Sequence, residues 1–475
     1  MPRFIRHISA SAQQFMINQV FGLGLFYVLS RALDKDGFGE LNWTLAVFMT
    51  AFGVLGMGLD QLTVRKIAAG DPPGKVIASY RFHVWTTGLL FYALLLGGSF
   101  LAPAFFLRHP LLLWIGIAKA GLFFSTPYKQ LATGKEAFRT LRWMSVVSSV
   151  IKGCVVLVCF FLHRLTMPVL LVIFITGDLV ELGVCAYLGK GLLKERLALR
   201  VDPKVWMGLL KESLPQTGVV LFSAAMARFD WIFIGLFCPA ARLAEYSFAY
   251  KAFEVSSLPL LIIAPLLVPA FTRFTRGDLE SRMPDLQRLL RGEMILACGT
   301  AMLLNMVWSP WVDALTAGRY GAVNARTIGL LSACLPLSYL NNFLWSLHFA
   351  KGRLKMIFWV FALSFAVNAV GDVCLIPIYG NEGAALAYLL SLGVQMVCYL
   401  SRTTEPGLRW SWVTLVMASA SAAFCGYLSV RLWTDAAVRA VGAGILYLFV
   451  LMVTLQIRKE DLNIKQPFGQ RPRME

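Results

Sequence analysis

The chain has 475 residues, of which 58% are apolar and 15% are charged, and its formal net charge is +18. Soluble domains contain about 45–50% apolar and about 25% charged residues, so this composition excludes an ordinary soluble globular protein. The nine cysteines include no CxxC motif and the five histidines are scattered, which gives no indication of a disulfide framework, a metal site or a cofactor.

Apolar segments of about 20 residues, long enough to cross a bilayer, predict about 14 transmembrane helices. In chain order they cover residues 13–33, 41–60, 81–107, 111–132, 142–162, 167–189, 212–237, 244–272, 292–313, 327–349, 355–377, 382–401, 410–431 and 436–457. The connecting segments are too short for a soluble catalytic domain, and there is no P-loop. We therefore expect an all-α polytopic membrane protein that is not an enzyme, with the first span retained as a signal anchor.

The 44 lysines and arginines fall mostly on alternate inter-span segments, those that face the cytoplasm if the N-terminus is inside. This is the positive-inside bias, so the positive charge indicates topology and places both termini in the cytoplasm. A nucleic-acid surface would need basic residues on a folded soluble domain, and we expect no nucleic-acid partner.

A weak internal repeat suggests two lobes. GELNWTLAVF (39–48) and AEYSFAYKAF (244–253) each follow a long span and a short outer turn. Parallel repeats of six helices would enter the membrane in the same sense. We expect an N-lobe at 1–189, a cytoplasmic linker with an amphipathic helix at 190–211, a C-lobe at 212–401, and two further helices with a cytoplasmic tail at 402–475.

Ionisable residues lie deep inside several predicted spans. A lone charge at the bilayer centre costs at least about 2.5–3.5 kcal/mol, so such residues should face protein or water. The basic ones are Lys119, Lys152, Arg228 and Lys251, and the acidic ones are Asp178, Glu181, Asp230, Glu254 and, nearer the outer end, Asp372.

Helical spacing places these residues on polar stripes. Ser145, Ser148, Ser149 and Lys152 share one face of their span, as do Asn368 and Asp372, and Asn341 and Asn342 belong to a similar stripe. The simplest arrangement points the stripes into one hydrated cavity between the lobes. Other interpretations stay open: Lys119 could snorkel outward, Lys251 and Glu254 could simply neutralise each other, and the two asparagines could hydrogen-bond to a neighbouring helix. Asp178 and Glu181, two like charges on one face, could instead form a proton or cation site.

Residues 29–68, LSRALDKDGFGELNWTLAVFMTAFGVLGMGLDQLTVRKIA, resemble the N-terminal signature of bacterial polysaccharide transporters. These are the O-antigen and exopolysaccharide flippases of the multidrug/oligosaccharidyl-lipid/polysaccharide (MOP) exporter superfamily. The matching positions are Phe38, Gly39, Gly58, Leu59, Asp60, Val64 and Arg65. RFDWIFIGLFCPAARLAEYSFAYKAFE (228–254) and IPIYGNEGAALAYLLS (376–391) are similar to later junctions of the same family.

The resemblance implies export of an undecaprenyl-diphosphate-linked oligosaccharide across the bacterial inner membrane. The cycle would be alternating access, driven by H⁺, Na⁺ or the membrane potential. Polysaccharide polymerases and glycosyltransferases of the same pathway would be partners. We expect Arg228 and Lys251, then Lys152 and Lys119, to contact the diphosphate, with the acids pairing or coupling ions. Asn341, Asn342 and Asn368 would line the cavity.

Four alternatives remain, one of them a lipid-scrambling or structural membrane protein, which is tested by whether transport needs an ion gradient. A peptidoglycan-precursor (lipid II) flippase of the same superfamily should be essential for growth, and a cation-coupled multidrug exporter should confer drug resistance. A membrane glycosyltransferase or polymerase would carry a large outer loop with catalytic acids, whereas the predicted outer segments here are short.

Overall fold

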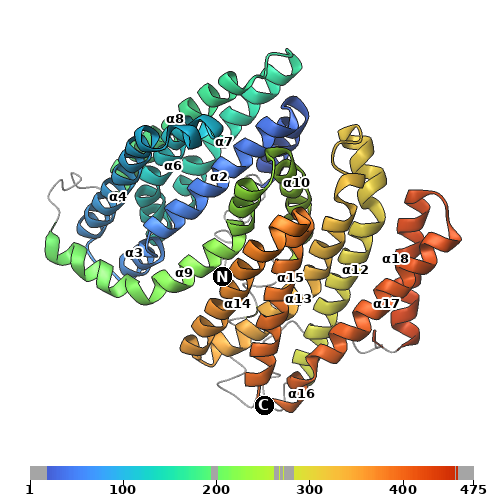
Figure 1. The fold of residues 1–475 in the computed structure, drawn as a ribbon. Coiled ribbons are helices and arrows are strands. Elements are labelled where there is room, and N and C mark those ends of the chain that lie inside the picture. Colours follow the sequence, from blue (N-terminus) through green and yellow to red (C-terminus); the bar gives the residue numbers. More distant parts are fainter. Residues whose placement is uncertain are drawn as a thin grey trace, which may run out of the picture. The chain divides into compact units, whose positions relative to one another are not determined.

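The computed structural model describes residues 19–193, 202–260, 267, 271, 283–454 and 456–457. Within those residues the secondary structure is helical, with no β-strand. The chain forms two compact units, Met1–Ala244 and Glu245–Glu475 (Figure 1).

The first unit begins with helical residues 19–32. It continues with α2 (Lys35–Leu55), α3 (Leu59–Ala68), α4 (Pro73–Leu101), α5 (Pro103–Arg108), α6 (Leu111–Gly134), α7 (Phe138–Phe161), α8 (Met167–Leu193) and α9 (Pro203–Phe237). Local sequence sets several starts: the Asp34 carboxylate caps α2 by accepting from Gly37 N–H, and proline occupies the first turn of α4, α5 and α9.

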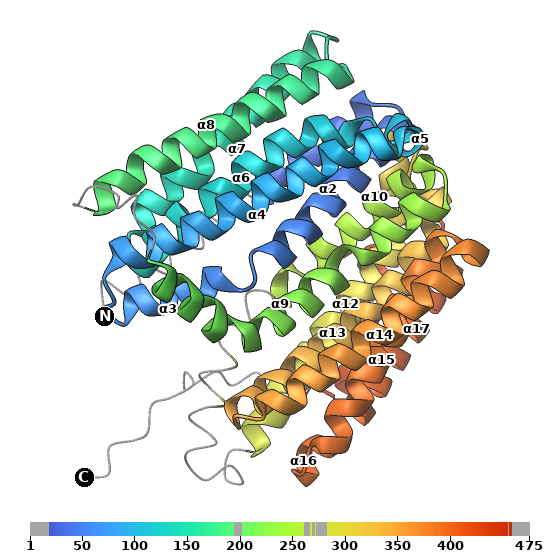
Figure 2. The same cartoon turned by 60° about the vertical axis from the view of Figure 1, so that its left-hand side comes forward.

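Helix α6 lies at the centre of the first unit. It packs against α3, α4 and α8, and α8 in turn packs against α7. Figure 2 shows α4, α6, α7 and α8 running side by side. Two thirds of the most apolar stretch of α6 is buried, compared with 11% for α4. A helix in this central position can present polar side chains to its neighbours, away from lipid.

The second unit takes in most of α10 (Ala240–Ser256). It also contains α12 (Met283–Thr316), the 3₁₀ turn η2 (Ala322–Asn324), α13 (Ala325–Ala350), α14 (Leu354–Tyr379), α15 (Asn381–Arg402), α16 (Pro406–Arg409), α17 (Ser411–Leu432) and α18 (Ala436–Val453). Its core lies where α13 packs against α12 and α15, and where α17 and α18 cover α12.

Eleven helices of the described residues are long and apolar enough to cross a membrane. They coincide with eleven of the expected spans, and large apolar side chains such as Phe100 and Val441 stand exposed on them, as lipid contact requires. The all-helical membrane fold is therefore confirmed. The expected spans at 13–33 and 244–272 lie partly outside the described residues, so the count of fourteen and the cytoplasmic termini stay predictions.

Helix α9 joins part of the expected linker to the expected span at 212–237. Residues 203–211, expected in the linker, continue without a break into the span at 212–237 as one 35-residue helix. Residues 194–201 lie outside the described part of the chain. The helix groups with the first compact unit, whereas the repeat assigns its membrane part to the C-lobe. The lobe boundaries drawn from the repeat stay a prediction.

Candidate functional site

The first unit encloses a cavity of about 530 Å³ among its helices. Its walls come from α2, α3, α4, α6, α7 and α8. The lining residues that carry charge are Asp60, Lys119, Lys129, Lys152 and Glu181. Aromatic rings cover part of the wall. Those of Phe52 and Phe123 stack on each other with their ring centroids 4.5 Å apart. Small-molecule sites are of this size and combine a mainly apolar wall with a few placed polar groups.

Two lysines share one buried carboxylate at the cavity. Lys119 on α6 donates a hydrogen bond of 3.0 Å to Asp178 Oδ2, and Lys152 on α7 donates to the other oxygen, Oδ1. Asp178 on α8 is fully buried, and its two partners are mostly buried. A carboxylate between two ammonium groups offsets much of the cost of burying all three charges. The structure thus brings together three residues that the sequence placed on separate helices.

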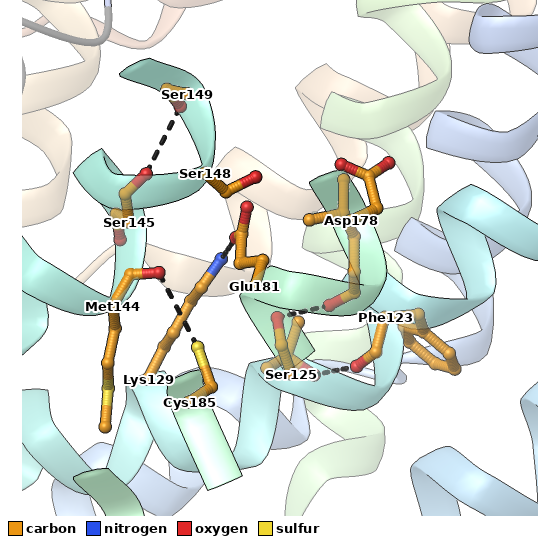
Figure 3. A network of polar contacts seen from close by, with 12 residues as sticks. Phe123, Ser125, Lys129, Met144, Ser145, Ser148, Ser149, Asp178, Glu181 and Cys185 are labelled. Atoms are coloured by element: carbon orange, nitrogen blue, oxygen red, sulfur yellow. Dashed lines mark hydrogen bonds and ion pairs between the residues drawn. The ribbon is translucent and has the colours of Figure 1, made fainter. Parts of the chain in front are cut away.

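A third ion pair continues the row along α6. Lys129 donates to Glu181 Oε1, and Glu181 lies one turn of α8 beyond Asp178 (Figure 3). Lys119 and Lys129 are ten residues apart, about 15 Å along the helix axis. These five paired charges therefore form an extended polar strip between α6 and α8, with α7 alongside.

Lys129 was missed at the sequence level. It lies in the stretch YKQLATGKEAFR (128–139), near the cytoplasmic end of the expected span 111–132, and was not singled out as a site residue. In the structure α6 runs on to Gly134, which keeps Lys129 within the helix. The signal that could have found it is Glu181, a buried acid of the sixth span that needs a basic partner.

The serine stripe of α7 divides between two roles. Ser145 and Ser149 line the cavity beside Lys152. Ser148 is buried and its hydroxyl donates to the carbonyl oxygen of Gly177 on α8, at 2.9 Å, which ties the two helices together. Of the three serines, two are therefore placed to meet a ligand.

The Gly-Leu-Asp part of the polysaccharide-transporter signature shapes one wall of the cavity. Gly58 adopts φ of +67° between α2 and α3, in the left-handed region that favours glycine. Leu59 is fully buried beneath the turn, and Asp60 faces the cavity. The motif thus turns the chain sharply at the edge of the site and adds a carboxylate to it.

Arg228 and Asp230 lie on α9 of the same unit. The Arg228 guanidinium sits over the ring of Trp231, 4.4 Å from its centroid. Asp230 is buried and accepts the N–H of Trp231. Neither residue is among those that line the 530 Å³ cavity.

The expected site residues of the second unit make local contacts. Lys251 and Glu254 on α10 pair at 2.8 Å, one helical turn apart. Asn341 on α13 donates to the carbonyl oxygen of Leu392 and to the Gln395 side chain on α15. The simpler interpretation of Asn341, hydrogen bonding to a neighbouring helix, is what its amide does here.

Two residues of the polar stripe on α14 bond to each other. Asn368 donates to Asp372 Oδ2 at 2.8 Å, and both side chains are buried. The amide nitrogen of Asn342 is buried and has no hydrogen-bond partner among the described residues. Substrate contact by these residues, and by Arg228 and Lys251, stays a prediction.

A family model supplies the decisive comparison. The model described as "Polysaccharide biosynthesis protein" matches residues 6–275, more than half of the chain, and this range holds every charge that lines the cavity. The chain belongs to the polysaccharide biosynthesis protein family. The resemblance seen in residues 29–68 is thereby confirmed. A comparison with curated proteins gave no match.

Several solved transporter structures share the fold of this chain. The structure "Lipid II flippase MurJ, inward closed conformation" superposes with a TM-score of 0.74 at 12% identity, covering 95% of this chain and 99% of that one. The structure of an inward-facing multidrug resistance MATE transporter of the MOP superfamily gives a TM-score of 0.61 at 13% identity. The match covers 87% of this chain and 99% of that one. A mutant of the Vibrio cholerae MATE transporter VcmN gives a TM-score of 0.55 at 16% identity, and the match covers 87% of this chain and 98% of that one.

Proposed function

We propose that the protein is a flippase for an undecaprenyl-diphosphate-linked oligosaccharide, a repeat unit of O-antigen, capsule or exopolysaccharide. The observation that carries the proposal is the strip of three lysines in the 530 Å³ cavity of the first unit. A lipid-linked diphosphate needs cationic groups within the membrane and a polar space for its sugars, while its polyprenyl tail stays in lipid. The family match to polysaccharide biosynthesis supports the same substrate class.

The lysines would bind the diphosphate by changing partners. In the structure Lys119 and Lys152 are held by Asp178, and Lys129 by Glu181. These acids offset the burial of the lysine charges while no anion is present. An entering diphosphate would take over the ammonium groups through charge-assisted hydrogen bonds. The acids released from pairing could then take up protons or cations, which links substrate binding to an ion gradient.

The remaining wall suits the sugars. Ser145, Ser149 and Gln130 offer hydrogen-bonding groups, and the stacked rings of Phe52 and Phe123 offer apolar faces. Arg228 and Lys251 remain candidates for diphosphate contact from the sequence. For Lys251 the substrate would have to compete with the ion pair to Glu254.

Alternating access is the mechanism that the fold favours. At the end of the membrane that the sequence assigns to the outside, the Trp43 indole on α2 donates to the Ile232 carbonyl oxygen on α9, at 3.2 Å. The two helices approach so closely at Gly235 that a Cβ atom there would lie 1.9 Å from the Trp43 ring. We propose that this contact opens in the outward state. Moving one charge across 100 mV is worth about 2.3 kcal/mol, enough to bias such a cycle.

A lipid II flippase is the second candidate, because the MurJ fold covers nearly the whole chain. Multidrug export is a further alternative on the MATE-like fold. We propose a bacterial inner membrane as the location of the protein for each of these functions. For the proposed substrate, the glycosyltransferases that build the repeat unit and the polymerase that consumes it would act before and after the protein.

Complementation separates these functions. The gene would be expressed in a strain that lacks its oligosaccharide flippase and, separately, in cells depleted of their lipid II flippase. The proposal expects surface polysaccharide to return in the first strain and growth not to return in the second. Rescue of the second strain alone would select the lipid II function. Drug resistance without rescue of either strain would select multidrug export.

A further inference from the structure

Glu293 is a buried acid that the proposed transport site does not use. It lies on α12, about 15 Å along the axis from the start of that helix, which is long and apolar enough to cross a membrane. Its side chain is 2% exposed. The residues one turn away on either side, Leu290 and Ala297, are apolar and buried in the core of the second unit.

Neither carboxylate oxygen of Glu293 has a hydrogen-bond partner among the described residues. No described basic side chain forms an ion pair with it. This separates Glu293 from Asp178 and Glu181, which are equally buried but are held by lysines. A bare carboxylate in such surroundings would cost several kcal/mol, whereas the neutral acid has no charge to desolvate.

The helices that pack against α12 supply no compensating charge at this level among the described residues. The Tyr339 hydroxyl on α13 lies within electrostatic range of Glu293. The other buried titratable side chains of this core among the described residues are Cys298 on α12, Tyr399 on α15, Cys425 on α17 and Tyr447 on α18. The Tyr447 hydroxyl donates to the Ile295 carbonyl oxygen. On α12 itself, Arg288 and Arg291 stand five and two residues before Glu293, so they point to other faces of the helix.

We propose that Glu293 is a proton-binding site of the second unit. The carboxyl holds its proton while α12 and α13 are packed as they are here, and it exchanges the proton when these helices separate. The second half of the proposal rests on the proposed transport cycle, because it needs a conformational change. The first half stands without it. The site binds a proton, which neutralises the Glu293 carboxylate. The Asp178 and Glu181 carboxylates are neutralised by lysines instead.

Infrared spectroscopy of the purified protein tests the protonation directly. At neutral pH the wild type should show the carbonyl stretch of a neutral carboxylic acid, and Glu293→Gln should remove that band. The matched control is Glu212→Gln, which changes a half-exposed acid paired with Lys66 and should leave the band in place. An unchanged band in Glu293→Gln would overturn the proposal.

Thermal melting gives an independent readout. Raising the pH above roughly 4 should lower the melting temperature of the wild type more than that of Glu293→Gln, because the unfolded chain loses the Glu293 proton there while the packed state keeps it, and the variant has no such proton. Stabilisation of the wild type by Na⁺ that Glu293→Gln abolishes would overturn the proposal in favour of a cation site. If Glu293→Gln does not fold, the wild-type dependence on pH and Na⁺ and an apolar variant, Glu293→Leu, decide between the two. None of these measurements needs substrate, so they fail or succeed independently of the flippase assignment.

Discussion

Lys129 on α6 donates a hydrogen bond to Glu181 on α8, across 52 residues of the chain. The pair extends the Lys119–Asp178–Lys152 group into a strip along one cavity. Five charges buried in a membrane bundle need mutual pairing to be tolerated, and each lysine here has an acidic partner on α8. The same lysines are the groups that an incoming diphosphate would find.

Replacing Lys129 by glutamine should reduce transport. The variant keeps a polar, slightly shorter side chain but removes one ammonium group from the cavity, so surface polysaccharide in a flippase-null strain should fall about tenfold or more. Lys135→Gln is the matched control: Lys135 follows directly after α6, is exposed and donates to the Leu192 carbonyl oxygen outside the cavity. Equal polysaccharide from the two variants at equal protein levels would count against the role of Lys129.

Asp178→Asn should destabilise the first unit. The change leaves Lys119 and Lys152 buried without their shared counter-charge, and loss of one partner of a buried ion pair costs about 3–5 kcal/mol. Thermal melting in detergent should show a large fall for Asp178→Asn. Glu212→Gln, in an ion pair whose acid is 46% exposed, should change stability by no more than about 1 kcal/mol. Similar shifts in the two variants would refute the argument from burial.

Gly235→Ala should loosen the contact between α2 and α9. A Cβ atom at Gly235 would lie 1.9 Å from a ring atom of Trp43, and the cost of such overpacking is about 1–3 kcal/mol. Gly183→Ala is the control, since nothing lies within 4 Å of a Cβ at that helical position. The melting temperature should fall for Gly235→Ala and stay or rise for Gly183→Ala. The opposite order would mean that the two helices are not tightly packed.

The ion pair between Lys351 and Glu405 should make stability depend on acid pH. Glu405 lies outside the membrane spans. Burial opposes its ionisation, but hydrogen bonds from Lys351, Thr404 and the backbone together with the Lys351 charge outweigh burial and lower the pKa of the Glu405 carboxyl. A lowered pKa in the folded state adds stability above the unfolded value, roughly 4, and that stability is lost as the pH falls through the folded pKa.

Glu405→Gln should therefore melt at a lower temperature than the wild type at neutral pH, by the equivalent of about 1–3 kcal/mol. The difference between the two proteins should shrink below roughly pH 4, where the wild-type carboxyl also becomes neutral. A difference that stays constant with pH would show that the Glu405 charge does not contribute.

Part of this site could be predicted from the sequence. A charge within an apolar span has to face protein or water, which identified Lys119, Lys152, Asp178 and Glu181 before their positions were known. Spacing along one helix gives the face of a residue but not the helix that it meets. For that reason the sequence left Asn341 open as cavity lining or as a partner of an unspecified neighbouring helix, and the structure shows its contacts with α15.

Two buried charges were not singled out from the sequence. Lys129 lies three residues before the expected end of the fourth span at 132, and Glu293 lies one residue after the expected start of the ninth at 292. In the structure α6 continues to Gly134, and α12 starts at Met283, ten residues before Glu293. Hydropathy marks where apolar residues end, whereas a helix continues for as long as its backbone hydrogen bonds do. Buried charges near a span's end are therefore the ones that hydropathy misses.

The most direct test of the central claim is equilibrium binding of undecaprenyl diphosphate to the purified protein. The variant Lys129→Gln/Glu181→Gln removes one lysine together with its acid, so the net charge of the cavity is unchanged. The account predicts that this variant binds the diphosphate about tenfold or more weakly than the wild type, as loss of a charge-assisted contact requires, and that Lys135→Gln binds it normally. Undiminished affinity in the double variant would contradict the claim that the lysine strip holds the diphosphate.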